Sequence, residues 1–264
     1  DMSRLVPSDL ERKLESGKSE NGFDISPYSF DIELADKSRQ SITVGGTVDR
    51  VDIEYNDDKS GGQIRVIDYK TGNKDAKLSR IYYGLDLQLL LYLFTLAKNN
   101  GANGFTPSAA LYHPSGKTSL KDIKAPSDEL KRGISLDEHK EKGFAGEGAQ
   151  QAAERRFSSG VKFERDKEVN TNFYSAVTIA GDKLKKLESR IEKVVKENTE
   201  QVKSGIVDAR PLVDDGKALS CEYCDFKDIC GMKQSSCVDV GSAEAVGFGE
   251  DIVVAKAKKG MGDK

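Results

Sequence analysis

Between Asp49 and Lys70 the sequence reads Asp-Arg-Val-Asp-Ile-Glu-Tyr (49–55), Asn-Asp-Asp-Lys-Ser-Gly-Gly (56–62) and Gln-Ile-Arg-Val-Ile-Asp-Tyr-Lys (63–70), and this stretch decides the fold. The outer segments alternate in character or are rich in β-branched residues, which predicts strands. The Asn, Asp, Ser and Gly residues between them are typical of a turn. An antiparallel hairpin is therefore predicted, and alternation extends its first strand back to Ser41.

A turn centred near Lys59 sets the register of this hairpin. Apolar residues then oppose apolar residues and two acids meet at the far end: Ile53 opposite Ile64, Val51 opposite Val66 and Asp49 opposite Asp68. Because side chains alternate between the two faces of a strand, Lys70 shares the face of Asp68. A slip of one residue would break both the apolar pairing and the acid pairing.

Two directly opposed carboxylates lie about 5 Å apart between their Cβ atoms. Asp49 and Asp68 would repel each other there, and a divalent cation such as Mg²⁺ or Mn²⁺ removes the conflict. Lys70 could hold an attacking water and neutralise charge on the phosphate that is attacked. Together these groups suffice for phosphodiester hydrolysis. A solvated strand end with an Asp–Lys ion pair explains the same residues, and geometry alone leaves both interpretations open.

Other elements follow from local patterns. Residues 29–34 are predicted as a strand, residues 87–98 as a helix that is apolar nearly all round, with Asp86 as its N-cap, and residues 109–112 as a short strand. A second long helix is predicted within Phe173–Val202, where apolar residues recur at helical spacing. Residues 113–160 are rich in Gly and charge, which predicts a long and mobile excursion.

The composition excludes several classes of protein. With 41 Lys and Arg against 44 Asp and Glu the formal net charge is −3, which argues against a strongly basic DNA-coating protein. No apolar run approaches the roughly 20 residues of a membrane span, so no membrane partner is expected. The 4 cysteines are too few and too clustered for a secreted disulfide scaffold, so a reducing, cytoplasmic setting is expected.

Three motifs of the chain resemble, in order and spacing, those of the RecB-like branch of the PD-(D/E)xK nucleases: Gly46-Thr47-Val48-Asp49-Arg50-Val51-Asp52, Val66-Ile67-Asp68-Tyr69-Lys70-Thr71-Gly72 and Gln88-Leu89-Leu90-Leu91-Tyr92. Residues 83–93 and 110–112 resemble more narrowly the C-terminal nuclease domains of the AddB type, which belong to AddAB helicase–nucleases of bacterial recombinational repair. The likeness covers roughly residues 28–232.

The resemblance implies an α/β fold with a restriction-endonuclease-like mixed β-sheet core flanked by helices, and a C-terminal cysteine-cluster appendage. It implies Mg²⁺-dependent (or Mn²⁺-dependent) cutting of single-stranded DNA during double-strand-break processing, with an AddA-type helicase–nuclease subunit as partner. By position, Asp49, Asp68 and the Tyr69 carbonyl would hold the metal, and Lys70 would be the catalytic lysine. Gln88 and Tyr92 would border the active site. Arg50 and Asp52 fall on the opposite strand face and are expected to form a structural ion pair.

Local sequence character and the resemblance together divide the chain into four segments: a polar N-terminal segment 1–27, the nuclease core 28–212, a cysteine segment 213–240 and a flexible tail 241–264. The family has an earlier helix whose His or Glu adds to the metal site, and nothing in residues 1–40 matches it convincingly. Since the chain starts Asp1-Met2 without an initiator Met, we expect that it was excised from a longer polypeptide that contains this helix.

All four cysteines fall within one short segment, at Cys221, Cys224, Cys230 and Cys237. Such clustering in a reducing compartment indicates a metal centre, and spacing alone does not separate zinc from iron–sulfur. The first three resemble the C-terminal ligands of the AddB-type [4Fe–4S] cluster, whose fourth ligand lies far upstream. This chain has no upstream cysteine, so Cys237 is either a substitute ligand or, as we favour, a free thiol.

Two other functions remain open at this stage. A free-standing RecB-like exonuclease of the CRISPR-adaptation type would also contain an iron–sulfur cluster, but the AddB-like stretch 83–93 argues against it. A catalytically silent RecB-like module could guide DNA, although Asp49, Asp68 and Lys70 would then have no reason to be present together.

Overall fold

The structure is a computed structural model, which describes residues 5–15, 23–34, 36–72, 74, 76–115, 141–146, 174–206, 208–231 and 236–253. Its centre is a six-stranded sheet in the order β1-β4-β5-β6-β7-β8. The strands are β1 (Leu5–Lys13), β4 (Thr47–Tyr55), β5 (Gly62–Lys70), β6 (Phe105–Pro114), β7 (Glu141–Gly146) and β8 (Tyr174–Ile179). The pairs β5–β6 and β7–β8 are parallel and the other neighbours antiparallel, so the predicted mixed sheet is confirmed.

The hairpin β4–β5 has the register predicted from its sequence. Ile53 lies opposite Ile64 and Val51 opposite Val66, and the described ladder ends with Arg50 opposite Ile67. Both apolar pairs are buried in the main hydrophobic core. Burial of one face fixes the register, and it brings the start of β4 to the end of β5.

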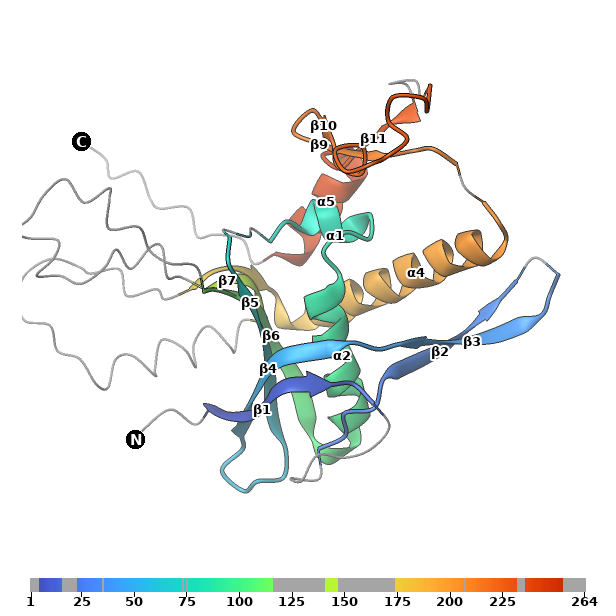
Figure 1. Ribbon diagram of the computed structural model, residues 1–264. Helices are drawn as coiled ribbons and strands as arrows, with labels where there is room; N and C mark the ends of the chain where they lie inside the picture. Colours follow the sequence, from blue (N-terminus) through green and yellow to red (C-terminus); the bar gives the residue numbers. More distant parts are fainter. Residues whose placement is uncertain are drawn as a thin grey trace, which may run out of the picture.

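A crossover with two helices, α1 (Leu78–Tyr82) and α2 (Gln88–Asn100), joins β5 to the parallel strand β6. Parallel neighbours require such a long connection. Helix α2 packs on β5 and β6, and α4 (Leu184–Lys203) lies on the same side of the sheet (Figure 1). Apolar residues occur nearly all round α2 because both the sheet and other elements cover it. No described helix has the length and apolarity of a membrane span.

Smaller elements surround this core. The hairpin β2 (Tyr28–Glu33) and β3 (Arg39–Val44) projects away from the main sheet beyond α4 (Figure 1). A small sheet of β9 (Leu212–Asp214), β10 (Lys217–Ala218) and β11 (Val238–Asp239) lies near α1, together with helix α5 (Ala243–Ile252). The cysteine segment is therefore a neighbour of the crossover that follows β5.

The structure corrects several predictions at the two ends of the chain. The polar segment 1–27 contains β1, which pairs with β4 along one edge of the central sheet. The tail predicted as flexible from residue 241 contains α5, which packs on α1, and only residues up to 253 are described. Both segments therefore extend the fold beyond the predicted core 28–212.

The helix predicted within Phe173–Val202 is confirmed as α4, which begins at Leu184, and β8 occupies the earlier part of that stretch. Two further predictions were wrong inside the chain. The excursion 113–160 contributes β7 to the sheet, and most of its other residues lie outside the described ranges. Asp86 does not cap α2: its φ is 56°, its side chain binds Lys74, and Leu87 occupies the cap position without a side-chain hydrogen bond.

Candidate functional site

The predicted acidic residues meet where β4 begins and β5 ends. Asp49 Oδ2 accepts a hydrogen bond of 2.9 Å from the backbone N–H of Tyr69. Lys70 Nζ lies 2.6 Å from Asp68 Oδ2. The hairpin register thus places Asp49, Asp68 and Lys70 together at one end of the sheet, and we call these three residues the acidic site.

The acidic site contains a carboxylate oxygen with incomplete partners. The Asp68 side chain is only 11% exposed, whereas that of Lys70 is 37% exposed. Among the described residues, Asp68 Oδ2 has the ion pair with Lys70 but no hydrogen bond. Buried polar atoms are normally hydrogen-bonded. Asp86 Oδ2, which has an ion pair with Arg80, is in the same state, so Asp68 Oδ2 has room for a further ligand but does not by itself identify one.

A divalent cation fits this donor set. No group of three or more His, Cys, Asp or Glu side chains in the described ranges is close enough to hold a metal ion. Mg²⁺, however, commonly binds through one or two carboxylates and keeps waters or substrate phosphate oxygens for the rest of its shell. Asp49 and Asp68 provide two such carboxylates, and the partly exposed Lys70 leaves solvent access beside them.

The other face of the same hairpin has a complete ionic cluster. Asp52 is fully buried and accepts hydrogen bonds from Arg50 Nε at 2.6 Å and Arg65 Nε at 3.1 Å, with a further contact from Arg65 Nη2. Burial raises the pKa of Asp52, but the hydrogen bonds and charges of the two arginines outweigh it and the net pKa is lowered. The predicted Arg50–Asp52 ion pair is confirmed; Arg65, which sequence reasoning missed, completes it.

Gln88 and Tyr92 contact each other on α2, and Tyr92 lies against Gly46 in the segment before β4. Gln88 Nε2 donates a hydrogen bond of 3.2 Å to the buried Tyr92 hydroxyl. A Cβ added to Gly46 would lie 2.0 Å from that hydroxyl, so only glycine fits there. In the described part of the chain no hydrogen bond or ion pair links either residue to the acidic site, so the structure places them as neighbours of the chain leading to Asp49.

Two residues beside the acidic site had no role in the sequence prediction. Tyr112 on β6 is aligned with Asp68 in the parallel β5–β6 register. Burial raises the pKa of Tyr112, and the negative charges of Asp86 and Asp68 raise it further, so its hydroxyl stays protonated. Lys74 Nζ lies 5.8 Å from the centre of the Tyr112 ring. The sequence placed Tyr112 at the end of a short apolar strand and within the AddB-like stretch 110–112, but neither pattern gave it a role, and Lys74 gave no signal.

The four cysteines are free thiols in the described part of the chain. Cys230 is exposed and the other three are partly exposed. No three of them are within reach of one ion in the described ranges. The segment that contains them is attached to the crossover by Asp214, whose carboxylate lies 3.2 Å from Lys77 Nζ and 3.4 Å from Arg80 Nη1.

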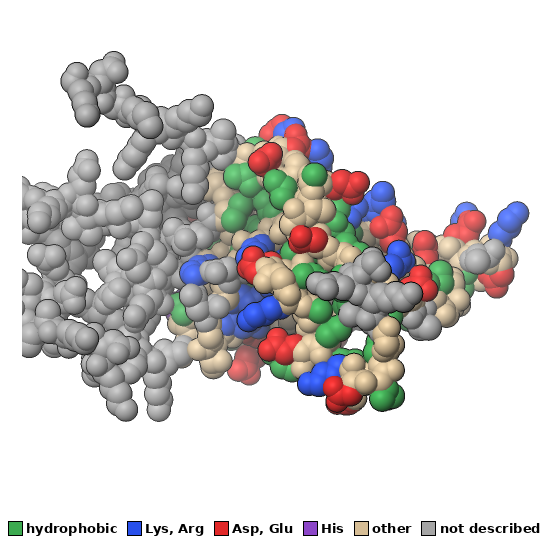
Figure 2. Space-filling model, turned by 90° about the horizontal axis from the view of Figure 1, so that it is seen from above, with side chains coloured by type: hydrophobic (Ala, Val, Ile, Leu, Met, Phe, Trp, Pro, Cys, Tyr) green, Lys and Arg blue, Asp and Glu red, His purple; other side chains and the backbone are tan. Residues whose placement is uncertain are grey.

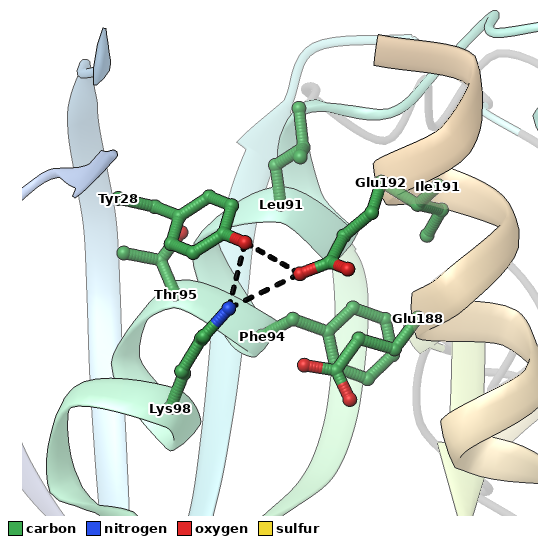
Figure 3. A pocket seen from close by; sticks show the side chains of 8 residues that line it. All are labelled: Tyr28, Leu91, Phe94, Thr95, Lys98, Glu188, Ile191 and Glu192. Atoms are coloured by element: carbon green, nitrogen blue, oxygen red, sulfur yellow. Dashed lines mark hydrogen bonds and ion pairs between the residues drawn. The ribbon is translucent and has the colours of Figure 1, made fainter. Parts of the chain in front are cut away.

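A small pocket lies between β2, α2 and α4 (Figure 3). The Tyr28 hydroxyl donates a 2.5 Å hydrogen bond to Glu192 Oε1 and accepts one of 2.6 Å from Lys98 Nζ, which also lies 3.2 Å from Glu192 Oε1. The three groups satisfy one another, and the remaining lining residues are Leu91, Phe94, Thr95, Glu188 and Ile191. This arrangement attaches the projecting hairpin to the two long helices.

Surface charge is mixed in sign. Figure 2 shows Lys and Arg side chains interspersed with Asp and Glu over the described part of one face. A negative overall balance is compatible with local contacts to an anionic polymer, because only the groups within about 10 Å act strongly at ordinary salt.

The chain belongs to the PD-(D/E)XK nuclease superfamily, and the sequence model of this family matches residues 3–231. This class agrees with the mixed sheet, the flanking helices and the Asp68-Tyr69-Lys70 segment at the end of β5.

More narrowly, the chain is similar to the AddB-type subunits of ATP-dependent helicase/deoxyribonucleases. It is 31% identical to the one from Clostridioides difficile over 212 residues, which cover 75% of this chain and 18% of the relative. It is 30% identical to the one from Acetivibrio thermocellus over 229 residues, 82% of this chain and 19% of the relative. The relative from Alkaliphilus metalliredigens is 28% identical over 77% of this chain and 18% of its own length. The chain therefore spans less than a fifth of these relatives.

Proposed function

We propose that the chain is the metal-dependent deoxyribonuclease domain of an AddB-type subunit, and that it hydrolyses phosphodiester bonds of single-stranded DNA. The observation that supports this most directly is the buried Asp68 Oδ2, which has no hydrogen bond in the described part of the chain although Lys70 and a second acid-bearing strand lie beside it. The family and the named relatives make the nuclease class plain; the substrate strand and the metal are the proposal.

The residues of the acidic site have separate tasks in this reaction. Asp49 and Asp68 would hold Mg²⁺ or Mn²⁺, with the Tyr69 carbonyl as a further oxygen ligand. The bound ion would polarise the scissile phosphate and lower the pKa of a water. Lys70 Nζ, which is partly exposed, would donate a hydrogen bond to the attacking water and neutralise negative charge as it develops on the phosphate. Gln88 and Tyr92 would keep the start of β4, and with it Asp49, in position.

The wider context is also a proposal. The named relatives are subunits of a helicase/deoxyribonuclease, so an AddA-type subunit would be the partner and the processing of DNA ends in recombinational repair the setting, in the cytoplasm. Because the chain spans 18% of the first relatives, the assembled activity would require the remaining polypeptide.

A second metal centre is proposed on the clustering of the cysteines and on the resemblance of the first three to the ligands of AddB-type clusters. Cys221, Cys224 and Cys230 would be ligands of a [4Fe–4S] cluster with a structural role, and Cys237 would be a free thiol. The three side chains would have to move together, since they are not within reach of one ion in the described ranges. Iron, zinc and sulfide analysis of anaerobically purified protein tests this: iron with equimolar sulfide supports the cluster, and zinc without sulfide overturns it.

Cleavage of labelled single-stranded DNA in Mg²⁺ or Mn²⁺ tests the nuclease proposal. Asp68→Asn and Lys70→Ala should each reduce the rate by about a thousandfold or more, because each removes an interaction with the reacting groups. Asp31→Asn, at an exposed position on β2, is the matched control and should cut like the wild type. Undiminished cutting by Asp68→Asn would overturn the assignment. DNA binding without cleavage, and without heat on titration with Mn²⁺, would instead indicate a silent DNA-guiding module.

A further inference from the structure

Lys74 lies in the crossover directly after the acidic site, between β5 and α1. Its Nζ is 2.6 Å from Asp86 Oδ1, and its side chain is 36% exposed. The same Nζ lies 5.8 Å from the centre of the Tyr112 ring. Lys74 is thus an accessible ammonium group that one carboxylate holds over one aromatic ring.

Tyr112 connects Lys74 with the acidic site. It is aligned with Asp68 on the neighbouring strand, and the charges of both Asp68 and Asp86 act on its hydroxyl. Side chains at aligned positions of adjacent strands project from the same face of a sheet. Tyr112 therefore projects from the face of Asp68 and Lys70, and Lys74 Nζ lies over the ring of this residue.

Asp86 can release Lys74 without losing every partner. Arg80 Nε lies 2.8 Å from Asp86 Oδ2, on the oxygen that Lys74 does not contact. Arg80 is the less exposed cation, at 26% against 36% for Lys74, and it also reaches Asp214 Oδ2 at 3.4 Å. A second anion arriving from solvent would therefore compete with Asp86 for Lys74, while Arg80 continues to balance Asp86.

We propose that Lys74 binds a backbone phosphate of DNA next to the scissile one, and that Asp86 holds it in position before DNA arrives. The inference rests on the proposed nuclease function and adds a substrate-positioning residue to it. A lysine is suited to this task because its ammonium group is a compact point charge with three donors that can exchange one oxygen partner for another. The competing interpretation is a purely structural tether between the crossover and Asp86.

The salt dependence of DNA binding separates these interpretations. For single strands the slope of log affinity against log salt changes by about 0.7 for each phosphate that a cation neutralises. Binding of a labelled oligothymidylate is measured in EDTA, so that no cleavage occurs, over a series of salt concentrations. Lys74→Met should reduce the slope by about 0.7 and weaken binding about fivefold at low salt. Lys74→Arg should keep the slope, and Asp86→Asn should tighten binding because it removes the competing charge.

Lys193→Met is the control, since Lys193 is an exposed α4 lysine paired with Glu197 in the same helix, and it should leave the slope unchanged. An unchanged slope in Lys74→Met overturns the inference, as does the loss of slope in Lys74→Arg. Should Lys74→Met unfold, the sign of the Asp86→Asn effect decides: weaker or equal binding overturns the proposal. Cleavage by the wild type in Mn²⁺ is measured in parallel. A wild type that neither binds nor cuts contradicts the nuclease function itself, whereas cutting with an unchanged Lys74→Met slope contradicts only the role of Lys74.

Discussion

The two faces of the β4–β5 hairpin contain ionic clusters of opposite kind. On one face Asp52 is fully buried between Arg50 and Arg65, and its two oxygens accept hydrogen bonds from both. On the other face Lys70 pairs with Asp68 and Asp49 accepts a hydrogen bond from the Tyr69 N–H, and Asp68 Oδ2 has no hydrogen bond in the described part of the chain. The same two strands thus hold one complete cluster and one incomplete cluster.

The difference indicates which cluster stabilises the fold and which binds a ligand. One carboxylate and two guanidinium groups give the Asp52 cluster a formal charge of +1, whereas two carboxylates and one ammonium group give the acidic site −1. A divalent cation would convert −1 into +1. With the cation bound, the acidic site would have the same formal charge of +1 as the Asp52 cluster. This positive charge would favour binding of a phosphate group.

The largest expected effect on stability comes from breaking the complete cluster. Asp52→Ala should lower the free energy of unfolding by about 3–5 kcal/mol, because it leaves two arginine side chains without their buried counter-charge. Urea denaturation measures this loss. Asp68→Asn, at the incomplete face, should lower stability by at most about 1 kcal/mol, because it removes only an ion pair with the partly exposed Lys70. Equal losses in the two variants would show that the two faces do not differ in this way.

Lowering the pH should also weaken the Asp52 cluster. The pKa of Asp52 is lowered in the folded protein, so its stabilising contribution is present above the ordinary value of 3.8 and is lost as the pH falls through the folded value. Denaturation at a series of pH values below about 4 should therefore show a steeper decline for the wild type than for Asp52→Asn. Parallel curves would contradict the lowered pKa.

Metal binding at the acidic site should raise the free energy of unfolding of the protein. At a Mg²⁺ concentration about 100 times its dissociation constant, the folded state gains about 2.7 kcal/mol. Thermal unfolding with and without Mg²⁺ should show this shift in the wild type and lose it in both Asp49→Asn and Asp68→Asn. A shift that persists in both variants would place the cation elsewhere. Because this measurement needs no DNA, it tests the metal separately from the cleavage reaction.

How far the sequence predicted the fold depended on the strength of local patterns. The β4–β5 register and the position of the acids followed from a turn between two apolar strands, since burial of one face makes the register unambiguous. Strand β1 gave no such signal: it lies at the sheet edge, includes Pro7, and shifts register between Pro7 and Asp9. Strand β1 forms because it pairs with β4, and such long-range pairing cannot be predicted from the local sequence.

The site was predicted in part for the same reason. The register places residues of the two strands near each other, and in the structure Asp49 accepts a hydrogen bond from the Tyr69 N–H while Lys70 lies beside Asp68. The positions of Lys74 and Asp86 were not predicted, because a crossover loop brings them to Tyr112. The left-handed backbone conformation of Asp86 also turns its side chain away from a cap position. The N-cap prediction for Asp86 failed on that backbone angle. Loop conformation and the partners across strands are tertiary information.

A moderate effect is expected where α2 approaches the start of β4. Gly46→Ala would place a Cβ 2.0 Å from the Tyr92 hydroxyl and 2.8 Å from its Cζ. The buried ring has to shift and its hydrogen bond with Gln88 breaks, so we expect a loss of about 1–3 kcal/mol in urea denaturation. Gly101→Ala is the matched control: its φ is −60° and no atom lies within 4 Å, so stability should be equal or higher. Tolerance of Gly46→Ala would mean that the segment before Asp49 is not held by Tyr92.

The smallest effect is expected in a cluster that is complete but half exposed. Tyr28→Phe removes the hydroxyl between Lys98 and Glu192, while the ring that lies 4.1 Å below Lys98 Nζ and the 3.2 Å ion pair both remain. The Lys98 side chain is 50% exposed and that of Glu192 32%, so water replaces the lost hydrogen bonds and the cost should be about 0.5–1 kcal/mol. Urea denaturation measures this loss of stability. Tyr223→Phe is the control, because the Tyr223 side chain is exposed and its substitution should leave stability unchanged. A loss of stability as large as that of Asp52→Ala would show that a fully paired ionic cluster stabilises the fold whether or not it is buried. A small loss would show that the large effect of Asp52 requires both full pairing and burial.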